Sequence, residues 1–228
     1  MKLPTLLLLS PLLAVAACPV PPDARLLLGV DVSDSIPKTD RADWLNTADQ
    51  FISCLGKGSR IEIFLVDANT RNEAPIFNAE VPSQTSKTVK GARDYIKARA
   101  AFRQRLTDAL DKAFRGDLKS PKTDVFGLLD RAASDAPTAM VLFSDAYATE
   151  DINLERVPIT PDKVPSMINS LAALHHWSGT TLRGEDIWVI LPSSGRIGPN
   201  DRVALRGLYE QLFHALGSNS LKRFDTHL

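Results

Sequence analysis

The chain has 228 residues, of which 44% are apolar and 24% are charged, and its basic and acidic residues balance at a formal net charge of zero. This length allows one domain with a sizeable buried core, and the composition excludes an intrinsically disordered chain. The balanced charge gives no reason to expect nucleic acid as a partner.

The first seventeen residues have the pattern of a secretory leader. A lysine at position 2 gives the positive start, and the apolar run 6–17 is too short for a permanent membrane span and ends in small residues. We therefore expect residues 1–17 to be a signal peptide. Residues 15–18 read Val-Ala-Ala-Cys, which resembles a bacterial lipobox and predicts cleavage before Cys18 and lipidation of that cysteine. The alternative is ordinary cleavage after Ala16, which leaves Cys18 unmodified.

The two cysteines, Cys18 and Cys54, are compatible with both interpretations. A lipidated Cys18 leaves Cys54 as a small buried hydrophobe near a helix end, whereas an unmodified Cys18 can pair with Cys54 in an oxidising compartment. The Pro-rich segment 19–24 is predicted to be a stiff tether of roughly 3 Å per residue. We expect the protein in the bacterial cell envelope, lipid-anchored or, in the alternative, soluble in the periplasm or secreted.

From residue 25 onward, strand patterns alternate with helix patterns. Continuous apolar runs are typical of parallel strands buried on both faces. Strands are predicted at residues 26–30, 61–66, 74–79, 139–143 and 187–191. Amphipathic patterns predict helices over residues 40–55, 87–115, 124–133, 164–177 and 202–216. This order predicts one doubly wound α/β domain over residues 25–228, with a mostly parallel sheet, one short antiparallel edge strand and helices on both faces.

The predicted helix 87–115 is strongly basic. It contains nine basic and three acidic residues, which gives a local charge of +6. The favoured interpretation is a solvated face, with Phe102, Leu106, Leu110 and Phe114 packed inward. The alternative is a contact with anionic lipid head groups or with an acidic partner.

Two adjacent histidines, His175 and His176, lie near a predicted helix end beside Trp177. No acidic residue or histidine follows at the spacing of a helical metal site, so we interpret them as helix-end capping or surface packing. The sequence has no nucleophile elbow and no phosphate-binding glycine loop. We therefore expect a binding protein and not an enzyme.

Oxygen-bearing side chains follow two of the predicted strands and precede one helix. Asp31, Ser33 and Ser35 come after the first strand, Asp145 ends another strand, and Thr123 stands where a helix N-cap is expected. Because the carboxyl ends of neighbouring parallel strands meet at one edge of a sheet, these five groups are expected to converge. Two carboxylates and three hydroxyls suit Mg²⁺, with Mn²⁺ or Ca²⁺ as alternatives.

These segments resemble the von Willebrand factor A (vWA) domain and its metal-ion-dependent adhesion site, over residues 25–228. Residues 28–35 match the Asp-x-Ser-x-Ser signature after an apolar strand, residues 122–129 are similar to the threonine motif, and residues 141–145 are similar to the strand that delivers the last aspartate. Residues 56–63 resemble the entry into the second strand. The chain departs from the family at Asp34 and Ala146, where glycine is usual.

The resemblance implies a metal-dependent binding module. The ion would be held by the five residues named above, with the two aspartates acting mostly through water, and would take a carboxylate from a protein partner. The loops 146–165 and 192–199 should rim this edge, and the candidate partner-binding residues there are Glu150, Asp151 and Arg156. The alternatives are a structural subunit of an envelope complex, in which the metal only stabilises the fold, and a metal-assisted hydrolase.

Overall fold

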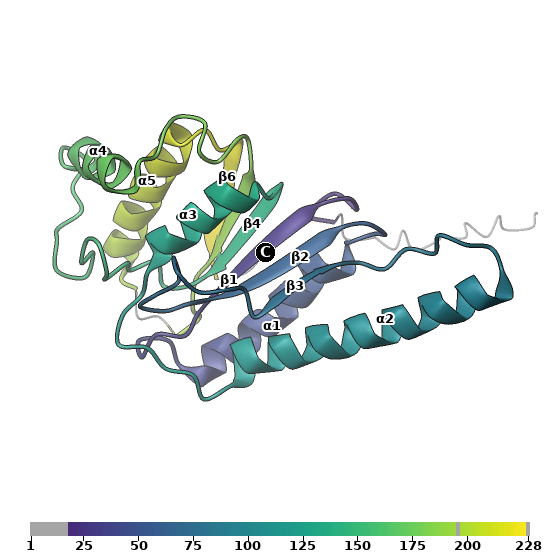
Figure 1. Ribbon diagram of the computed structural model, residues 1–228. Helices are drawn as coiled ribbons and strands as arrows, with labels where there is room; N and C mark the ends of the chain where they lie inside the picture. Colours follow the sequence, from purple (N-terminus) through teal and green to yellow (C-terminus); the bar gives the residue numbers. More distant parts are fainter. Residues whose placement is uncertain (1–17, 195–196, 227–228) are drawn as a thin grey trace, which may run out of the picture.

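A computed structural model describes residues 18–194 and 197–226, which form a central sheet between two helical layers (Figure 1). The expected signal peptide, residues 1–17, lies outside the described residues. In chain order the elements are β1 (Arg25–Asp31), α1 (Lys38–Ser53), β2 (Arg60–Val66), β3 (Phe77–Glu80), α2 (Val89–Leu110), the π-helical turn η1 (Asp111–Arg115), α3 (Val125–Asp135), β4 (Ala139–Phe143), α4 (Val164–His175), β5 (Asp186–Ile190), α5 (Pro199–Ala215) and β6 (Ser220–Asp225).

The sheet has the strand order β3-β2-β1-β4-β5-β6. All neighbouring strands are parallel except β3, which pairs antiparallel with β2 at one edge. This arrangement confirms the predicted fold class, a doubly wound and mostly parallel sheet with one short antiparallel edge strand. The predicted edge strand, residues 74–79, begins three residues and ends one residue before β3. The sequence patterns missed β6, whose sequence Ser-Leu-Lys-Arg-Phe-Asp is mostly polar because it lies at the other edge.

Strand side chains alternate between two hydrophobic cores, one on each face of the sheet. On one face, Leu27 and Met140 pack with residues of α3, α4 and α5. On the other face, Leu26 and Val141 pack with residues of α1 and α2. Gly29 lets α3 approach β1, because a Cβ atom there would lie 2.3 Å from a methyl carbon of Leu128. This close approach brings the start of α3 next to the end of β1.

The basic helix differs from its prediction at the C-terminal end, where α2 stops at Leu110 and η1 follows. Leu106, Leu110 and Phe114 are buried and Phe102 is partly buried against the same core, as expected. No residue before Leu106 in α2 is buried. The N-terminal part of α2 therefore extends past the sheet, as Figure 1 shows.

The segment after Cys18, where a stiff Pro-rich tether was predicted, packs on the domain with Val20 and Ala24 buried. Cys18 and Cys54 form a disulfide with Cα atoms 5.6 Å apart, which is the pairing expected of an unmodified Cys18. The carbonyl of Pro22 accepts hydrogen bonds from Gly56 N and Ser59 Oγ. A thioether-linked lipid would need the Cys18 sulfur that the disulfide occupies. Among the described helices, none is long and apolar enough to cross a membrane.

Candidate metal centre

The site begins where β1 ends. Asp31 Oδ1 accepts a hydrogen bond of 2.8 Å from the backbone N–H of Ser33, which closes an Asx turn directly after the strand. The hydroxyls of Ser33 and Ser35 lie 2.8 Å apart. The Asp-x-Ser-x-Ser sequence therefore turns its three oxygen-bearing side chains toward one another.

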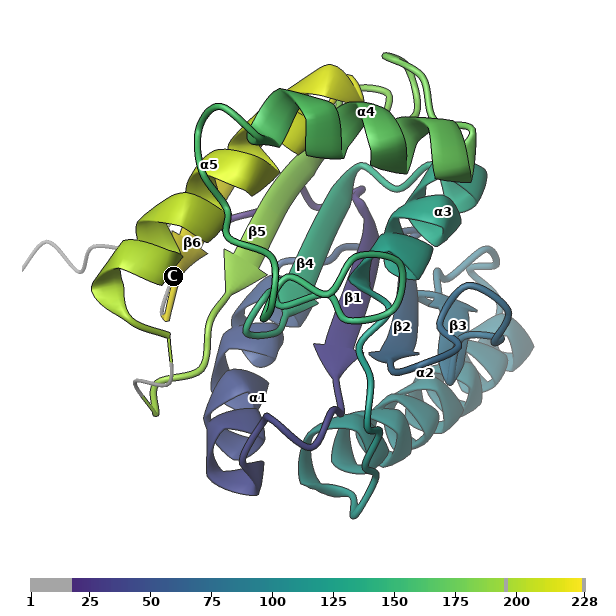
Figure 2. The ribbon, with the colours of Figure 1, turned by 90° about the vertical axis from the view of Figure 1, so that its left-hand side faces the viewer.

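The end of β4 joins this turn, at the carboxyl edge that faces the viewer in Figure 2. Ser35 Oγ donates to Asp145 Oδ2 at 2.8 Å, and Ser144 Oγ donates to Asp31 Oδ2 at 2.6 Å. The backbone N–H of Tyr147 donates to the second oxygen of Asp145. Four of the five predicted ligands, Asp31, Ser33, Ser35 and Asp145, thus belong to one hydrogen-bonded cluster, together with Ser144.

Thr123 lies beside the cluster, but its expected role as the helix cap was wrong. The N-cap of α3 is Asp124, whose carboxylate accepts from Gly127 N at 2.7 Å. Thr123 is buried and exchanges two hydrogen bonds with Thr149: its N–H donates to Thr149 Oγ1, and its carbonyl accepts from Thr149 N. No hydrogen bond joins its hydroxyl to Asp31 or Ser33, so its role as a ligand stays a prediction.

Asp31 has an unusual electrostatic environment. Burial and, second, the nearby charge of Asp145 raise the pKa of its carboxyl group to about 7, against the lowering effect of the hydrogen bonds from Ser144 and Ser33. Both of its hydrogen-bond donors are neutral groups. A bound cation would favour the ionised form and would remove much of the cost of burying this charge.

Arg41 is a neighbour that the sequence interpretation missed. It is buried on α1, where burial lowers the pKa of its guanidinium while the charge of Asp31 acts in the opposite direction. Its Nη1 donates to the Leu118 carbonyl at 3.3 Å, and its Nε has no hydrogen-bond partner. The sequence did indicate that Arg41 is buried, because it precedes Trp44 by three positions and so lies on the apolar face of α1.

The turn after Asp145 explains one departure from the family pattern. Ala146 has φ 64°, in the left-handed region that glycine adopts without strain. Its N–H donates to Ser144 Oγ, and its carbonyl accepts from the buried hydroxyl of Tyr209 at 2.9 Å. These contacts hold alanine in a conformation where glycine is the usual residue, so the turn keeps its shape.

Among the described residues, no group of three or more His, Cys, Asp or Glu side chains could hold a metal ion. A cation at this edge would therefore depend on hydroxyl oxygens beside its two carboxylates. The hydroxyls of Ser33 and Ser35 lie where such a site needs them. The donor set of the cluster fits a hard cation such as Mg²⁺.

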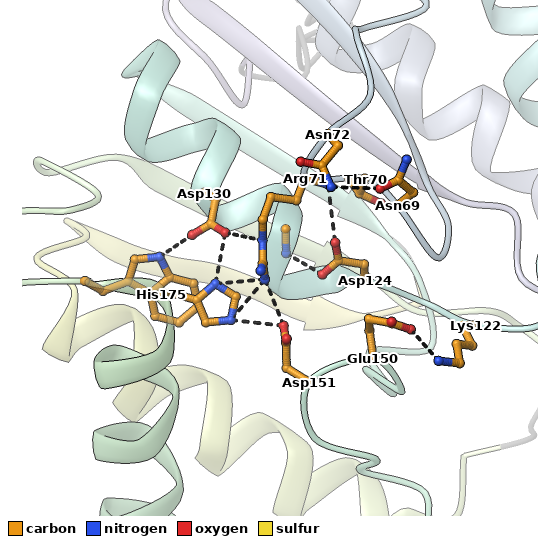
Figure 3. A network of polar contacts seen from close by, with 12 residues as sticks. Asn69, Thr70, Arg71, Asn72, Lys122, Asp124, Asp130, Glu150, Asp151 and His175 are labelled. Carbon is orange, nitrogen blue, oxygen red and sulfur yellow. Dashed lines mark hydrogen bonds and ion pairs between the residues drawn. The ribbon is translucent and has the colours of Figure 1, made fainter.

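A second polar cluster, shown in Figure 3, corrects the interpretation of His175. The His175 side chain is 0% exposed, and its two ring nitrogens lie 2.9 Å from Asp130 Oδ2 and 3.0 Å from Asp151 Oδ2. Arg71 bridges the same two carboxylates at 2.7 and 3.0 Å, and Trp177 Nε1 donates to Asp130. Local spacing could not reveal this cluster, because its carboxylates lie far from His175 in the sequence.

The candidate partner-binding residues have different environments. Asp151 belongs to the second cluster, and Glu150 forms an ion pair of 3.0 Å with Lys122. Both residues fix the loop that follows β4. Arg156 is exposed and lines a cavity of about 530 Å³ between this loop and α5. Of the three, Arg156 is the best placed to reach a partner.

Neither a scan against protein-family models nor a search of curated proteins found a match to this chain. The resemblance to vWA domains therefore rests on the motif residues quoted above.

Proposed function

We propose that this chain is a vWA-like binding module of the bacterial cell envelope, which binds a divalent cation, preferably Mg²⁺, and through it an acidic side chain of a protein partner. The observation that carries this proposal is the environment of Asp31. Its buried carboxylate has only neutral hydrogen-bond donors, and it belongs to a cluster with Ser33, Ser35 and Asp145 at the carboxyl edge of the sheet.

The chemistry of the proposed ligands would leave a bound ion able to take a further anionic ligand. The hydroxyls of Ser33, Ser35 and Thr123 are neutral, and Asp31 and Asp145 would act mostly through water. Mg²⁺ prefers about six oxygen ligands in octahedral geometry, so a partner carboxylate would complete the set. The surrounding loop would supply selectivity, with Arg156 as its exposed charge.

Binding is favoured over catalysis by the residues around the cluster. A metal-assisted hydrolase needs a general base beside the ion. Beside the proposed ligands, Ser144 already donates to Asp31, and Arg41 and Tyr209 lie close enough to interact with its charge. None of these three side chains is a ready general base. We therefore assign no enzymatic activity to the chain.

The leader pattern and the Cys18–Cys54 pairing both support an oxidising compartment outside the cytoplasm. The pairing favours a periplasmic or secreted protein, because lipidation would compete for the Cys18 sulfur. Mass spectrometry of the native protein separates the two forms: a diacylglyceryl group on Cys18 would show the lipoprotein, and an intact disulfide would show the unmodified chain.

The test of the function is capture of envelope proteins on the immobilised chain from Cys18 to Leu228. We expect proteins that are retained in millimolar Mg²⁺, released by EDTA, and not retained by a matched Ser33→Ala/Ser35→Ala column. Capture that ignores EDTA would refute metal-dependent binding. Capture by the double variant, together with a Mg²⁺-dependent stability that only the wild type shows, would instead support the structural-subunit alternative.

A further inference from the structure

The outer segment of α2 and its approach, residues 87–105, packs on the domain mainly near its C-terminal end, where Phe102 contacts Phe77 and Arg105 lies over the Phe77 ring. None of these residues is buried, and two apolar side chains are strongly exposed, Val89 at 74% and Ile96 at 65%. Figure 1 shows this part of α2 extending past the sheet, away from the rest of the domain. The first three turns of α2, residues 89–99, have no buried residue and gain little from the fold they belong to, so they are available for an external contact.

The outer segment carries almost all of the local positive charge. Its only acidic residue is Asp94. Its seven basic residues are Lys87, Lys90, Arg93, Lys97, Arg99, Arg103 and Arg105. The net charge of the outer segment is therefore +6, the same as that of the whole stretch 87–115. Among the described residues, no carboxylate forms an ion pair with any of the seven.

A cavity of about 440 Å³ lies on the inner side of this segment, between α2 and the loop after α1. Its apolar lining includes Leu55, Phe102 and Leu106, and three basic residues also line it, Lys57, Arg99 and Arg103. An apolar hollow with basic side chains fits an amphiphile that has an anionic head and a hydrocarbon part. A purely polar polyanion such as nucleic acid would make no use of the apolar lining.

The position of this surface in the fold agrees with a membrane contact. The loop that lines the cavity follows Cys54, which forms the disulfide with Cys18. In the same loop, the N–H of Gly56 donates a hydrogen bond to the carbonyl of Pro22. The start of the mature chain and the outer segment therefore lie at the amino edge of the sheet. Figures 1 and 2 together place this end of α2 opposite the carboxyl edge that carries Asp31 and Asp145.

We propose that the outer segment of α2, with the adjoining cavity, docks on the anionic phospholipid head groups of a bilayer. Basic side chains interspersed with exposed apolar ones are typical of helices that lie at the membrane interface. Such docking turns the candidate metal centre away from the bilayer and toward proteins in the adjacent space. The contact does not depend on the metal centre, and it does not require a lipid on Cys18.

The test is co-sedimentation of the chain from Cys18 to Leu228 with vesicles, since residues 18–226 carry the sheet and both cores. Vesicles of phosphatidylcholine with 30% phosphatidylglycerol are compared with pure phosphatidylcholine. We expect binding to the anionic vesicles only, decreasing as salt rises. The variant Lys90→Glu/Arg93→Glu/Lys97→Glu should lower the partition coefficient by about 100-fold or more, because each basic residue near an anionic surface contributes about fivefold and each reversal also adds a repelled charge.

A matched control reverses three exposed lysines outside the outer segment, Lys112→Glu/Lys119→Glu/Lys163→Glu, with the same change in net charge. This control should keep most of the binding. Equal loss in both triple variants would show a response to net charge only and would overturn the proposal, as would equal binding to neutral vesicles or no binding at all. Circular dichroism melts of both variants verify that each is folded.

Discussion

Two carboxylate clusters in this molecule, one buried and one partly exposed, are neutralised in different ways. Asp130 and Asp151 have a cation supplied by the chain itself, because Arg71 lies within 3.0 Å of both and His175 lies between them. The hydrogen bonds to Asp31 come from the hydroxyl of Ser144 and from the backbone and side chain of Ser33, all of them neutral donors. One cluster is complete as the chain folds, and the other is suited to take a cation from solution.

The pKa shifts in the two clusters follow from this difference. Burial raises the pKa of Asp31 to about 7, so its charge is disfavoured in the fold. Burial alone would lower the pKa of Arg71, but Asp130 and Asp151 raise it above its usual value, so its charge is favoured there. A cluster with a cation in direct contact is expected to stabilise the fold. The cluster around Asp31 has Arg41 nearby but forms no ion pair with it among the described residues, and we expect it to lower stability and gain ligand affinity instead.

The largest effect is expected from Arg71→Ala, which removes the built-in cation. Two carboxylates and a histidine with a fully covered side chain would lose their bridge. Because the guanidinium is partly exposed and its ion pairs are screened, the free energy of unfolding should fall by about 2–3 kcal/mol in urea denaturation. Lys122→Ala is the control, because its ion pair with Glu150 is partly exposed and should be worth less than about 1 kcal/mol. Similar small losses in both variants would show that the second cluster is not a stabilising one.

Asp31→Asn should change the free energy of unfolding in the opposite direction to Arg71→Ala. In EDTA at pH 8 this substitution removes a buried charge and keeps the side-chain shape, so the free energy of unfolding should rise by about 2 kcal/mol. The same variant should lose its response to Mg²⁺. A variant that is less stable than the wild type in EDTA would contradict the account of Asp31 as an uncompensated charge.

The pH dependence of the metal-free protein follows from the same group. Because the folded-state pKa of Asp31 is about 7 and the ordinary pKa of an aspartate is 3.8, the folded state holds this proton more tightly. The difference in stability between wild type and Asp31→Asn should therefore grow as pH rises from about 4 to 7, and stay constant above it. Melts at several pH values in EDTA measure this difference. A difference that does not change over this range would rule out the raised pKa.

The smallest effect is expected at Tyr209→Phe. This change removes the hydroxyl that donates to the Ala146 carbonyl at 2.9 Å and leaves that carbonyl buried without the bond. We expect a loss of about 1 kcal/mol in stability. The loss should be accompanied by weaker Mg²⁺ binding, because the turn that follows Asp145 is less firmly held. Unchanged metal affinity would show that Tyr209 acts on stability alone.

Local pattern was sufficient for the central strands and for most of the cluster at the carboxyl edge. The run at residues 139–143 matches β4 at both ends because every residue in it is buried. Asp31, Ser33 and Ser35 meet because a single turn holds them, and parallel strands bring Asp145 to the same edge. These features depend on short-range order and on a general rule of parallel sheets, both of which are visible in sequence.

Features that depend on distant contacts were not predictable in the same way. The side chain of His175 is covered by contacts with Asp130, Asp151 and Arg71. These three residues belong to other segments of the chain, so the local sequence around His175 does not reveal the contacts. β6 forms on a polar sequence because β5 offers an edge to pair with. The N-cap of α3 is Asp124 and not the predicted Thr123, a difference of one residue that sequence pattern alone does not resolve.

The central claim is that the cluster around Asp31 binds a divalent cation, and thermal unfolding tests it most directly. The chain from Cys18 to Leu228 is melted at pH 8 in EDTA and in millimolar Mg²⁺, beside Ser33→Ala/Ser35→Ala. A ligand that binds only the folded state raises Tm by mass action. We predict a Mg²⁺-dependent rise in Tm for the wild type and none for the double variant. Equal Tm values in EDTA and Mg²⁺ for the wild type would contradict the claim.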